Sequence, residues 1–230
     1  MRPLGLLAAI AGLALVAAAT GDTSSTRPPA TPGLVALVNG SATGDTLYES
    51  QFCGGVAVGP TMVLTVAHCI TGRTATNIAV ASGGTDLCTG AGIVLHAVAG
   101  LGNGTPGTEV AELLLTDPLP GPFATTADGP AAGTLSVRGW GKTSPAGAPA
   151  CGAKTMTLSP IPLEGCRSLP ASGRAAKDRH VFCAVPVRAS ANTCQGDSGS
   201  PVYNATASLV GLVLGGIGCG PHDDGIYAVP

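Results

Sequence analysis

The apolar residues of this chain fall in short runs, and this pattern limits the folds it can adopt. Glycine, proline, asparagine or aspartate ends nearly every run before it reaches helical length. Short runs that are rich in β-branched residues and bounded by turn residues are typical of an all-β barrel or sandwich. Examples are LVALV (34–38), MVLTVA (62–67), VAELLL (110–115), LSVRGW (135–140) and SLVGLVLG (208–215). No segment shows a long helical period, so the chain is predicted to be all-β.

A proline-rich stretch divides the predicted strands into two groups. Residues 117–133 contain four prolines and are predicted to be an inter-lobe linker. The N-terminal lobe is predicted over residues 34–116 and the C-terminal lobe over residues 134–230. Residues 20–33 are rich in Ser, Thr and Pro and are predicted to form a flexible lead-in. A chain of 230 residues can bury ample core in such an arrangement.

The first nineteen residues have the pattern of a secretory signal peptide. Arg2 precedes an apolar run that ends in Ala17-Ala18-Ala19, a small-residue cleavage site. The alternative is a membrane anchor, but the run is shorter than the roughly 20 residues that a spanning helix needs. Residues 1–19 are therefore predicted to be removed, and the mature protein is predicted to be extracellular and free of the membrane.

Charge and cysteine usage exclude several classes of partner. Charged residues make up 10% of the chain, its net charge is −2, and no lysine/arginine cluster occurs, which argues against a nucleic-acid partner. Eight cysteines in a secreted chain predict up to four disulfides. A metal site is the weaker interpretation, since the sequence contains no CxxC pair and only His68 directly adjoins a cysteine. No metal and no other cofactor is predicted.

Three sequence motifs occur in a specific order along the chain. They are Cys53-Gly-Gly followed by Thr65-Val-Ala-His-Cys69, then Gly139-Trp-Gly141, then Cys194-Gln-Gly-Asp-Ser-Gly-Ser-Pro201. Together they resemble the chymotrypsin/trypsin-like serine peptidases, and the resemblance runs from about residue 31 to residue 229. GDSG alone is a modest signal, whereas the ordered set with matching cysteines is highly specific. The resemblance implies two packed antiparallel six-stranded Greek-key β-barrels with the active site in the cleft between them.

The resemblance also assigns roles to individual residues. A serine hydroxyl is a poor nucleophile until a base removes its proton, and neutral histidine suits that task near pH 7. The motifs make Ser198 the nucleophile and His68 the base, with the backbone amides of Gly196 and Ser198 as the oxyanion hole. The alternative for His68 is a structural histidine beside a disulfide.

The family's disulfides map onto the cysteines of this chain. The resemblance implies Cys53–Cys69 around the loop that carries His68, Cys166–Cys183 in the second lobe, and Cys194–Cys219 beside the specificity pocket. Cys88 and Cys151 remain and would pair with each other, bridging the two lobes.

The third catalytic group has two candidates. The family places an aspartate at the head of a strand, and the corresponding segment here reads GTEVAELLL (107–115). Glu109 falls on that position, and a glutamate can also fix the imidazole tautomer. Glu112 is the rival, since a slipped register would bring it inward. The third possibility is that neither acid serves.

The chain departs from the family at three further places. The family's Ile-Val-Gly-Gly activation sequence is absent, so Asp197 needs another cation, and Arg138 is the candidate. The alternative is that Arg138 is a solvated strand residue. The family's cleft segment Ser-Trp-Gly is replaced by Leu214-Gly215-Gly216, and the family's closing helix after the last strand is absent.

The primary specificity pocket is expected to be neutral. Its floor aligns with Asn192, whereas cleavage after Lys or Arg needs an acid there. Gly216 and Gly225 would leave the walls open to a sizeable side chain. Asp223 and Asp224 lie close in sequence and could supply a charge from another wall.

These observations favour a secreted serine endopeptidase that acts as a monomer on protein or peptide substrates through an acyl-enzyme. One alternative is a catalytically impaired interaction domain on the same fold, suggested by the altered acid and ends. Another is an esterase for small acyl substrates that uses the same residues.

Overall fold

The computed structural model of the protein describes residues 31–104, 108–127, 131–170, 180–187 and 192–230. The predicted signal peptide, residues 1–19, and most of the predicted lead-in lie outside these ranges. Within them, no helix is long and apolar enough to cross a membrane.

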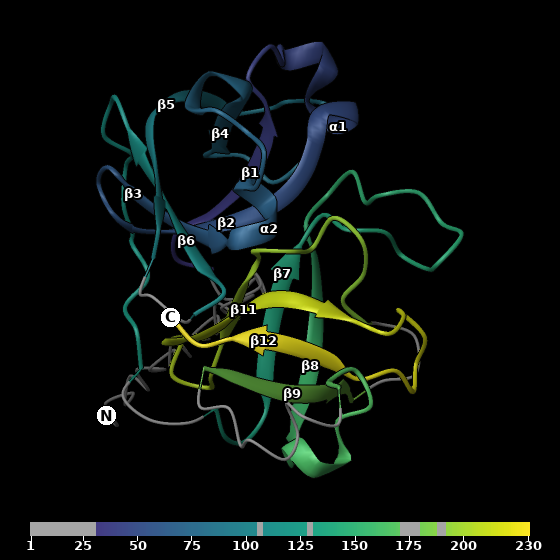
Figure 1. The fold of residues 1–230 in the computed structure, drawn as a ribbon. Helices are drawn as coiled ribbons and strands as arrows, with labels where there is room; N and C mark the ends of the chain where they lie inside the picture. The colour runs from purple at the N-terminus through teal and green to yellow at the C-terminus, as the bar shows by residue number, and fades with distance from the viewer. Residues whose placement is uncertain (1–30, 105–107, 128–130, 171–179, 188–191) are drawn as a thin grey trace, which may run out of the picture. The chain divides into compact units, whose positions relative to one another are not determined.

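The first half of the described chain forms a closed barrel of antiparallel strands, drawn in purple to teal in Figure 1. Its strands close in the order β1-β2-β3-β6-β5-β4. They are β1 (Leu34–Asn39), β2 (Gln51–Gly59), β3 (Met62–Val66), β4 (Ile78–Ser82), β5 (Val94–Asn103) and β6 (Val110–Leu115).

The second half forms another closed barrel, drawn in green to yellow. Its strands close in the order β10-β11-β12-β9-β8-β7. They are β7 (Leu135–Gly139), β8 (Lys154–Ile161), β9 (Val181–Pro186), β10 (Pro201–Tyr203), β11 (Leu209–Gly216) and β12 (Gly225–Ala228). The prediction of two six-stranded antiparallel barrels is therefore confirmed.

Helical structure in the described residues is confined to single turns. The α-helical turns are α1 (Leu47–Ser50) and α2 (Ala67–Ile70), and the 3₁₀ turns are η1 (Gly44–Thr46), η2 (Ala75–Asn77) and η3 (Leu163–Gly165). Of these, α2 carries His68, the predicted base.

Strand β1 shows why the apolar runs are continuous rather than alternating. Val35 and Leu37 are buried inside the first barrel, while Ala36 and Val38 face a second cluster that contains Trp140. Successive strand residues point to opposite faces, so an apolar residue at every position means that both faces are covered. Each fully buried Val or Leu side chain stabilises the folded state by about 1.5–3 kcal/mol relative to an exposed one.

All eight cysteines are paired in the structure. The disulfides are Cys53–Cys69, Cys88–Cys151, Cys166–Cys183 and Cys194–Cys219, the same pairs that the resemblance implied.

The Cys88–Cys151 disulfide belongs to a larger link between the two halves of the chain. Beside it, the Leu87 amide donates to the Cys151 carbonyl oxygen at 2.8 Å. The Trp140 indole Nε1–H donates to the Thr85 carbonyl oxygen, also at 2.8 Å. The Gly139-Trp-Gly141 motif is thereby anchored to the loop between β4 and β5.

Candidate active site

His68 is held beside Glu109 by the pairing of β3 with β6. Val66, the last residue of β3, lies opposite Val110, the first residue of β6. The Ala67 amide then donates to the Glu109 carbonyl oxygen at 2.8 Å. The turn α2 begins directly after β3, level with the start of the neighbouring strand β6. This brings His68 next to Glu109.

The imidazole of His68 is in a mixed environment. Its partial burial lowers the pKa of His68, and the nearby Glu109 carboxylate raises it, with burial the larger effect. One imidazole nitrogen lies within 4.8 Å of the Cys53 and Cys69 sulfurs. Those sulfurs form a disulfide and are not thiolates, so this cluster is not a metal site.

Strand alternation separates the two candidate acids. Ala111 and Leu113 are buried, whereas Leu114 is exposed, so Glu112 shares the outward face of β6 with Leu114. A Cβ on Gly102 of β5 would lie only 3.4 Å from Glu112 Oε2, which puts that carboxylate over the neighbouring strand. The structure brings Glu109, and not Glu112, to His68. Among the described residues, no hydrogen bond joins the imidazole to either Glu109 or Ser198.

Ser198 lies in a tight turn that both barrels hold. Its carbonyl oxygen accepts a hydrogen bond from the Gly54 amide of β2 at 2.7 Å, and the Gly199 amide donates to Val213 of β11 at 2.7 Å. The backbone amides of Gly196 and Ser198 donate to no acceptor within the described part of the chain. Two N–H groups next to the serine hydroxyl are therefore free for a ligand, as an oxyanion hole requires.

Asp197 is fully buried, and its carboxylate is completely engaged. It accepts hydrogen bonds from the Gly141 amide at 2.7 Å and the Cys194 amide at 2.9 Å. It also forms an ion pair with Lys154, whose Nζ lies 2.5 Å from Oδ2. The predicted pairing of Asp197 with Arg138 is therefore wrong, and Lys154 supplies the cation.

Strand geometry explains this correction. Gly139 of β7 faces Asp197, because a Cβ there would lie 2.5 Å from Asp197 Oδ1. Arg138 is the preceding residue, so it points to the opposite face, and its Nε donates weakly to the Ala153 carbonyl oxygen at 3.5 Å. Lys154 lies directly opposite Gly139 on β8 and shares its face. Sequence reasoning missed Lys154, which only the β7–β8 register could have indicated.

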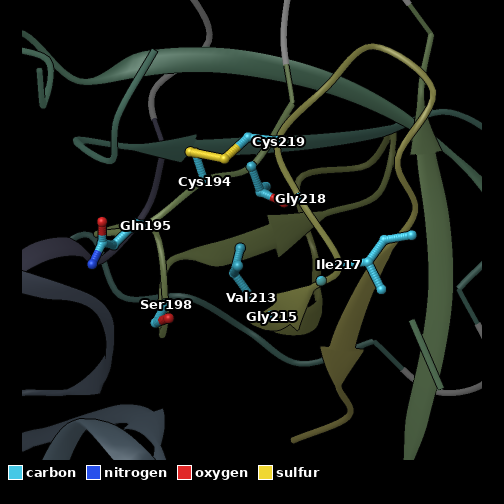
Figure 2. Close-up of a pocket in the computed structure, with 10 residues that line it drawn as sticks. Cys194, Gln195, Ser198, Val213, Gly215, Ile217, Gly218 and Cys219 are labelled. Atoms are coloured by element: carbon cyan, nitrogen blue, oxygen red, sulfur yellow. A yellow bond between two sulfur atoms is a disulfide. The ribbon is translucent and has the colours of Figure 1, made fainter. Parts of the chain in front are cut away.

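A pocket of about 260 Å³ opens beside Ser198. In Figure 2, Ser198 and Ile217 lie at opposite edges of the pocket, and the Cys194–Cys219 disulfide closes a third side. The lining residues are Thr193, Cys194, Gln195, Ser198, Val213, Gly215, Gly216, Ile217, Gly218 and Cys219. None of them carries a charged side chain.

Of the three residues predicted for this pocket, only Gly216 lines it. Gly225 is the cross-strand partner of Gly216 and does not line the pocket. Asn192 precedes the lining residue Thr193, and its amide nitrogen donates to the carbonyl oxygens of Gly220 at 3.0 Å and Asp223 at 2.9 Å. Asn192 therefore braces the neighbouring loop, because its hydrogen-bond donors are engaged there.

The two aspartates near the pocket also have other partners. Asp224 is 1% exposed and accepts hydrogen bonds from Arg167 Nε at 3.1 Å and from the Ser168 amide at 2.7 Å. Asp223 accepts a hydrogen bond from the Gly220 amide at 2.8 Å and lies 3.9 Å from Arg167 Nη2. Neither lines the pocket, so no carboxylate from the described part of the chain faces a side chain bound there.

Sequence comparisons point to one family. The sequence profile described as Trypsin matches residues 22–229. A trypsin from Saccharopolyspora erythraea is 31% identical over 189 residues, which cover 77% of this chain and 82% of that protein. A trypsin-like protease from Streptomyces glaucescens is 29% identical over 185 residues, which cover 75% of this chain and 68% of that protein.

Solved structures agree with the sequence comparisons. The VesB protease of Vibrio cholerae superposes with a TM-score of 0.70 at 27% identity, over 86% of this chain and 60% of that one. Neuropsin, a serine protease expressed in the limbic system of mouse brain, superposes with a TM-score of 0.68 at 25% identity, over 86% of this chain and 89% of that one. This chain therefore spans less than two thirds of the VesB chain.

Proposed function

Because the chain belongs to the trypsin family of serine-type endopeptidases, we propose that it cleaves peptide bonds with Ser198 as nucleophile, His68 as general base and Glu109 as the carboxylate that orients His68. The observation that carries the proposal is the pair of uncommitted backbone amides at Gly196 and Ser198, beside a neutralised Asp197. An interaction domain has no need of such a site.

The reaction follows from the roles of these groups. His68 accepts the proton of the Ser198 hydroxyl while the oxygen attacks the substrate carbonyl carbon. The carbonyl π electrons move to oxygen, which accepts hydrogen bonds from the Gly196 and Ser198 amides. His68 then donates the proton to the departing amine as the C–N bond breaks, leaving an acyl-enzyme. Water, deprotonated by His68, hydrolyses the ester and restores Ser198.

The lowered pKa of His68 suits this role, because it keeps the imidazole neutral at neutral pH. The missing hydrogen bond between His68 and Ser198 does not argue against the role, since such bonds are often long without substrate and tighten in the complex.

Lys154 makes a cut at the chain terminus unnecessary for activity. A buried carboxylate needs a counter-charge, and Asp197 has one in Lys154, whose side chain is 19% exposed. The remaining acceptor positions of Asp197 are taken by two backbone amides. The turn that carries Ser198 is therefore stabilised by a side chain of the same chain, and the folded enzyme needs no activating cut beyond removal of the signal peptide.

The neutral pocket favours an uncharged side chain on the residue before the cleaved bond. A Lys or Arg side chain there would lose its hydration without gaining a carboxylate partner. The pocket instead offers the apolar side chains of Val213 and Ile217. We expect leucine, methionine or phenylalanine to be preferred over lysine and arginine.

Secretion is part of the same proposal. The four disulfides persist only in an oxidising compartment, and residues 1–19 have the pattern of a signal peptide.

A fluorophosphonate probe tests the proposal directly, because it labels only a serine whose base and oxyanion hole are assembled. We expect the purified secreted protein to be labelled without further proteolysis and the Ser198→Ala variant to remain unlabelled. Absence of labelling, even after limited proteolysis, would favour an interaction domain. Turnover of nitrophenyl esters without any peptide cleavage would instead identify an esterase.

A further inference from the structure

Gln51 connects the first barrel to the turn that carries Ser198. It is the first residue of β2, yet its side chain reaches a residue 145 positions later in the sequence. Its amide nitrogen donates to the carbonyl oxygen of Gly196 at 2.8 Å and to that of Cys53 at 3.0 Å. Both neighbours are acceptors, so the nitrogen end of the amide must face them.

The backbone around Gly196 is otherwise held by hydrogen bonds from its own barrel. The Gln195 carbonyl oxygen accepts from the Lys142 amide at 2.8 Å, and the Asp197 amide donates to the Cys194 carbonyl oxygen at 2.9 Å. In a trans peptide the C=O and N–H groups point in opposite directions. The bond from Lys142 therefore turns the Gly196 N–H to the opposite side, where it stays free.

Gly196 needs this support because its conformation is one that few residues adopt. Its φ is +96°. A glycine has no side chain to lock this geometry, so rotation at Gly196 can turn its N–H away from the oxyanion hole unless both adjoining peptides are held. The N–H of the Gly196–Asp197 peptide is held by the Cys194 carbonyl oxygen. The Gln51 hydrogen bond holds the C=O of the same peptide.

The other end of the Gln51 amide supports a specific role. Its Oε1 is buried and has no hydrogen-bond partner among the described residues. Leaving a buried acceptor unpaired is unfavourable, and an apolar side chain of the same length would avoid that cost. If Gln51 served packing alone, methionine or leucine would therefore fit better. Methionine and leucine lack the side-chain N–H that donates to the Gly196 carbonyl oxygen.

We propose that Gln51 is a positioning residue for the oxyanion hole, holding the Gly196 carbonyl so that the Gly196 N–H faces the developing oxyanion. The inference rests on the proposed peptidase function. It assigns part of the catalytic geometry to the first barrel, which otherwise contributes His68 and Glu109. Because the oxyanion forms only in the transition state, loss of Gln51 should lower kcat and leave KM almost unchanged.

The test compares Gln51→Met, which keeps the length but removes the donor, with Tyr48→Phe. Tyr48 is a matched control because its hydroxyl donates to the Pro149 carbonyl oxygen at 3.0 Å, another link between the two halves of the chain. We expect kcat on a peptide substrate to fall about tenfold to a hundredfold in Gln51→Met, with KM within about twofold. Tyr48→Phe should keep the wild-type kcat.

Two inhibitors distinguish positioning from general distortion. A peptide aldehyde forms a tetrahedral adduct whose oxygen occupies the oxyanion hole, whereas a reduced-bond peptide lacks that oxygen. We expect Gln51→Met to lose aldehyde affinity in parallel with kcat and to keep its affinity for the reduced-bond peptide. Unchanged aldehyde affinity, or equal loss for both ligands, would overturn the role. If Gln51→Met fails to fold, Gln51→Ala removes the same donor and is judged by the same ratio.

The wild-type protein in the same assay separates the two hypotheses. A wild-type protein without turnover overturns the peptidase function and, with it, this role of Gln51. An active wild-type protein beside a fully active Gln51→Met variant overturns the role of Gln51 alone.

Discussion

Ser82 and His96 form one hydrogen-bonded serine–histidine pair in this chain, and Ser198 and His68 are the pair proposed to be catalytic. Ser82 Oγ lies 2.9 Å from His96 Nε2, and both residues are buried, at 7% and 8% exposure. His68 is exposed, and no hydrogen bond to Ser198 is present among the described residues. By hydrogen bonding alone, the pair within the barrel would look like the better catalyst.

The difference between the pairs lies in the backbone rather than in the side chains. Ser82 is a regular strand residue, opposite Val94 in the β4–β5 ladder. Ser198 lies in a turn in which its own amide and that of Gly196 have no acceptor among the described residues, and a pocket opens beside it. A serine–histidine contact is therefore a weak indicator of catalysis, and free donors aimed at one point are a strong one.

Serine substitutions test this comparison with the largest expected effect. Ser198→Ala should lower kcat on the order of 10⁶-fold, because the nucleophile is removed. Ser82→Ala should keep its activity and lose about 1–3 kcal/mol of stability, because the His96 ring nitrogen becomes unpaired. Steady-state kinetics and thermal unfolding measure the two effects. Loss of activity in Ser82→Ala would show that the buried pair takes part in catalysis.

The two glutamates of β6 sharpen the comparison at His68. Glu109→Gln should lower kcat/KM by up to about 10⁴-fold, whereas Glu112→Gln should have little effect. The Glu109 carboxylate raises the pKa of His68, so its removal should also move the acidic limb of the kcat/KM profile to lower pH. The reverse order of effects would transfer the role to Glu112.

Replacing Lys154 tests whether the free amides depend on a neutralised Asp197. Lys154→Ala leaves a buried charge unpaired, and we expect kcat to fall about 10²–10³-fold as the oxyanion hole distorts. Lys154→Arg keeps the charge and should retain more activity, and Arg138→Ala should have no effect. Peptide turnover measured before and after trypsin treatment checks this, and recovery of Lys154→Ala after treatment would contradict it.

The smallest expected effect concerns the buried pair and pH. Burial lowers the pKa of His96, and the Asp117 carboxylate partly opposes this. The unfolded chain therefore binds this proton more readily, so the stability due to His96 is present above the ordinary histidine pKa and is lost as pH falls through the lowered one. His96→Gln should flatten the fall of Tm between about pH 8 and pH 5. The exposed His222→Gln should leave the curve unchanged, and a His96→Gln curve like that of wild type would contradict the prediction.

The features that sequence predicted correctly are those that act locally along the chain. Short β-branched runs indicated the strands because period and turn residues are local properties. The order of the motifs around His68, Trp140 and Ser198 indicated how the strands form two barrels.

The features that sequence missed depend on which strands pair and in what register. Lys154 reaches Asp197 only because it lies opposite Gly139 in the β7–β8 register. Arg138 is one position before Gly139, so its side chain points to the opposite face of the strand. Gln51 reaches Gly196 across the contact between the two halves of the chain, which no local pattern encodes. The family resemblance places Asn192 at the floor of the pocket, but its side-chain amide nitrogen donates to the Asp223 carbonyl oxygen instead.

The cation beside Asp197 also sets the timing of activity. Lys154 lies in the interior of the chain, so every molecule that completes the second barrel carries its own counter-charge. Progress curves should therefore be linear from the first turnover, without a lag and without the sigmoid shape of autocatalysis. The onset of hydrolysis is therefore expected to coincide with folding of the second barrel, without a separate activation step.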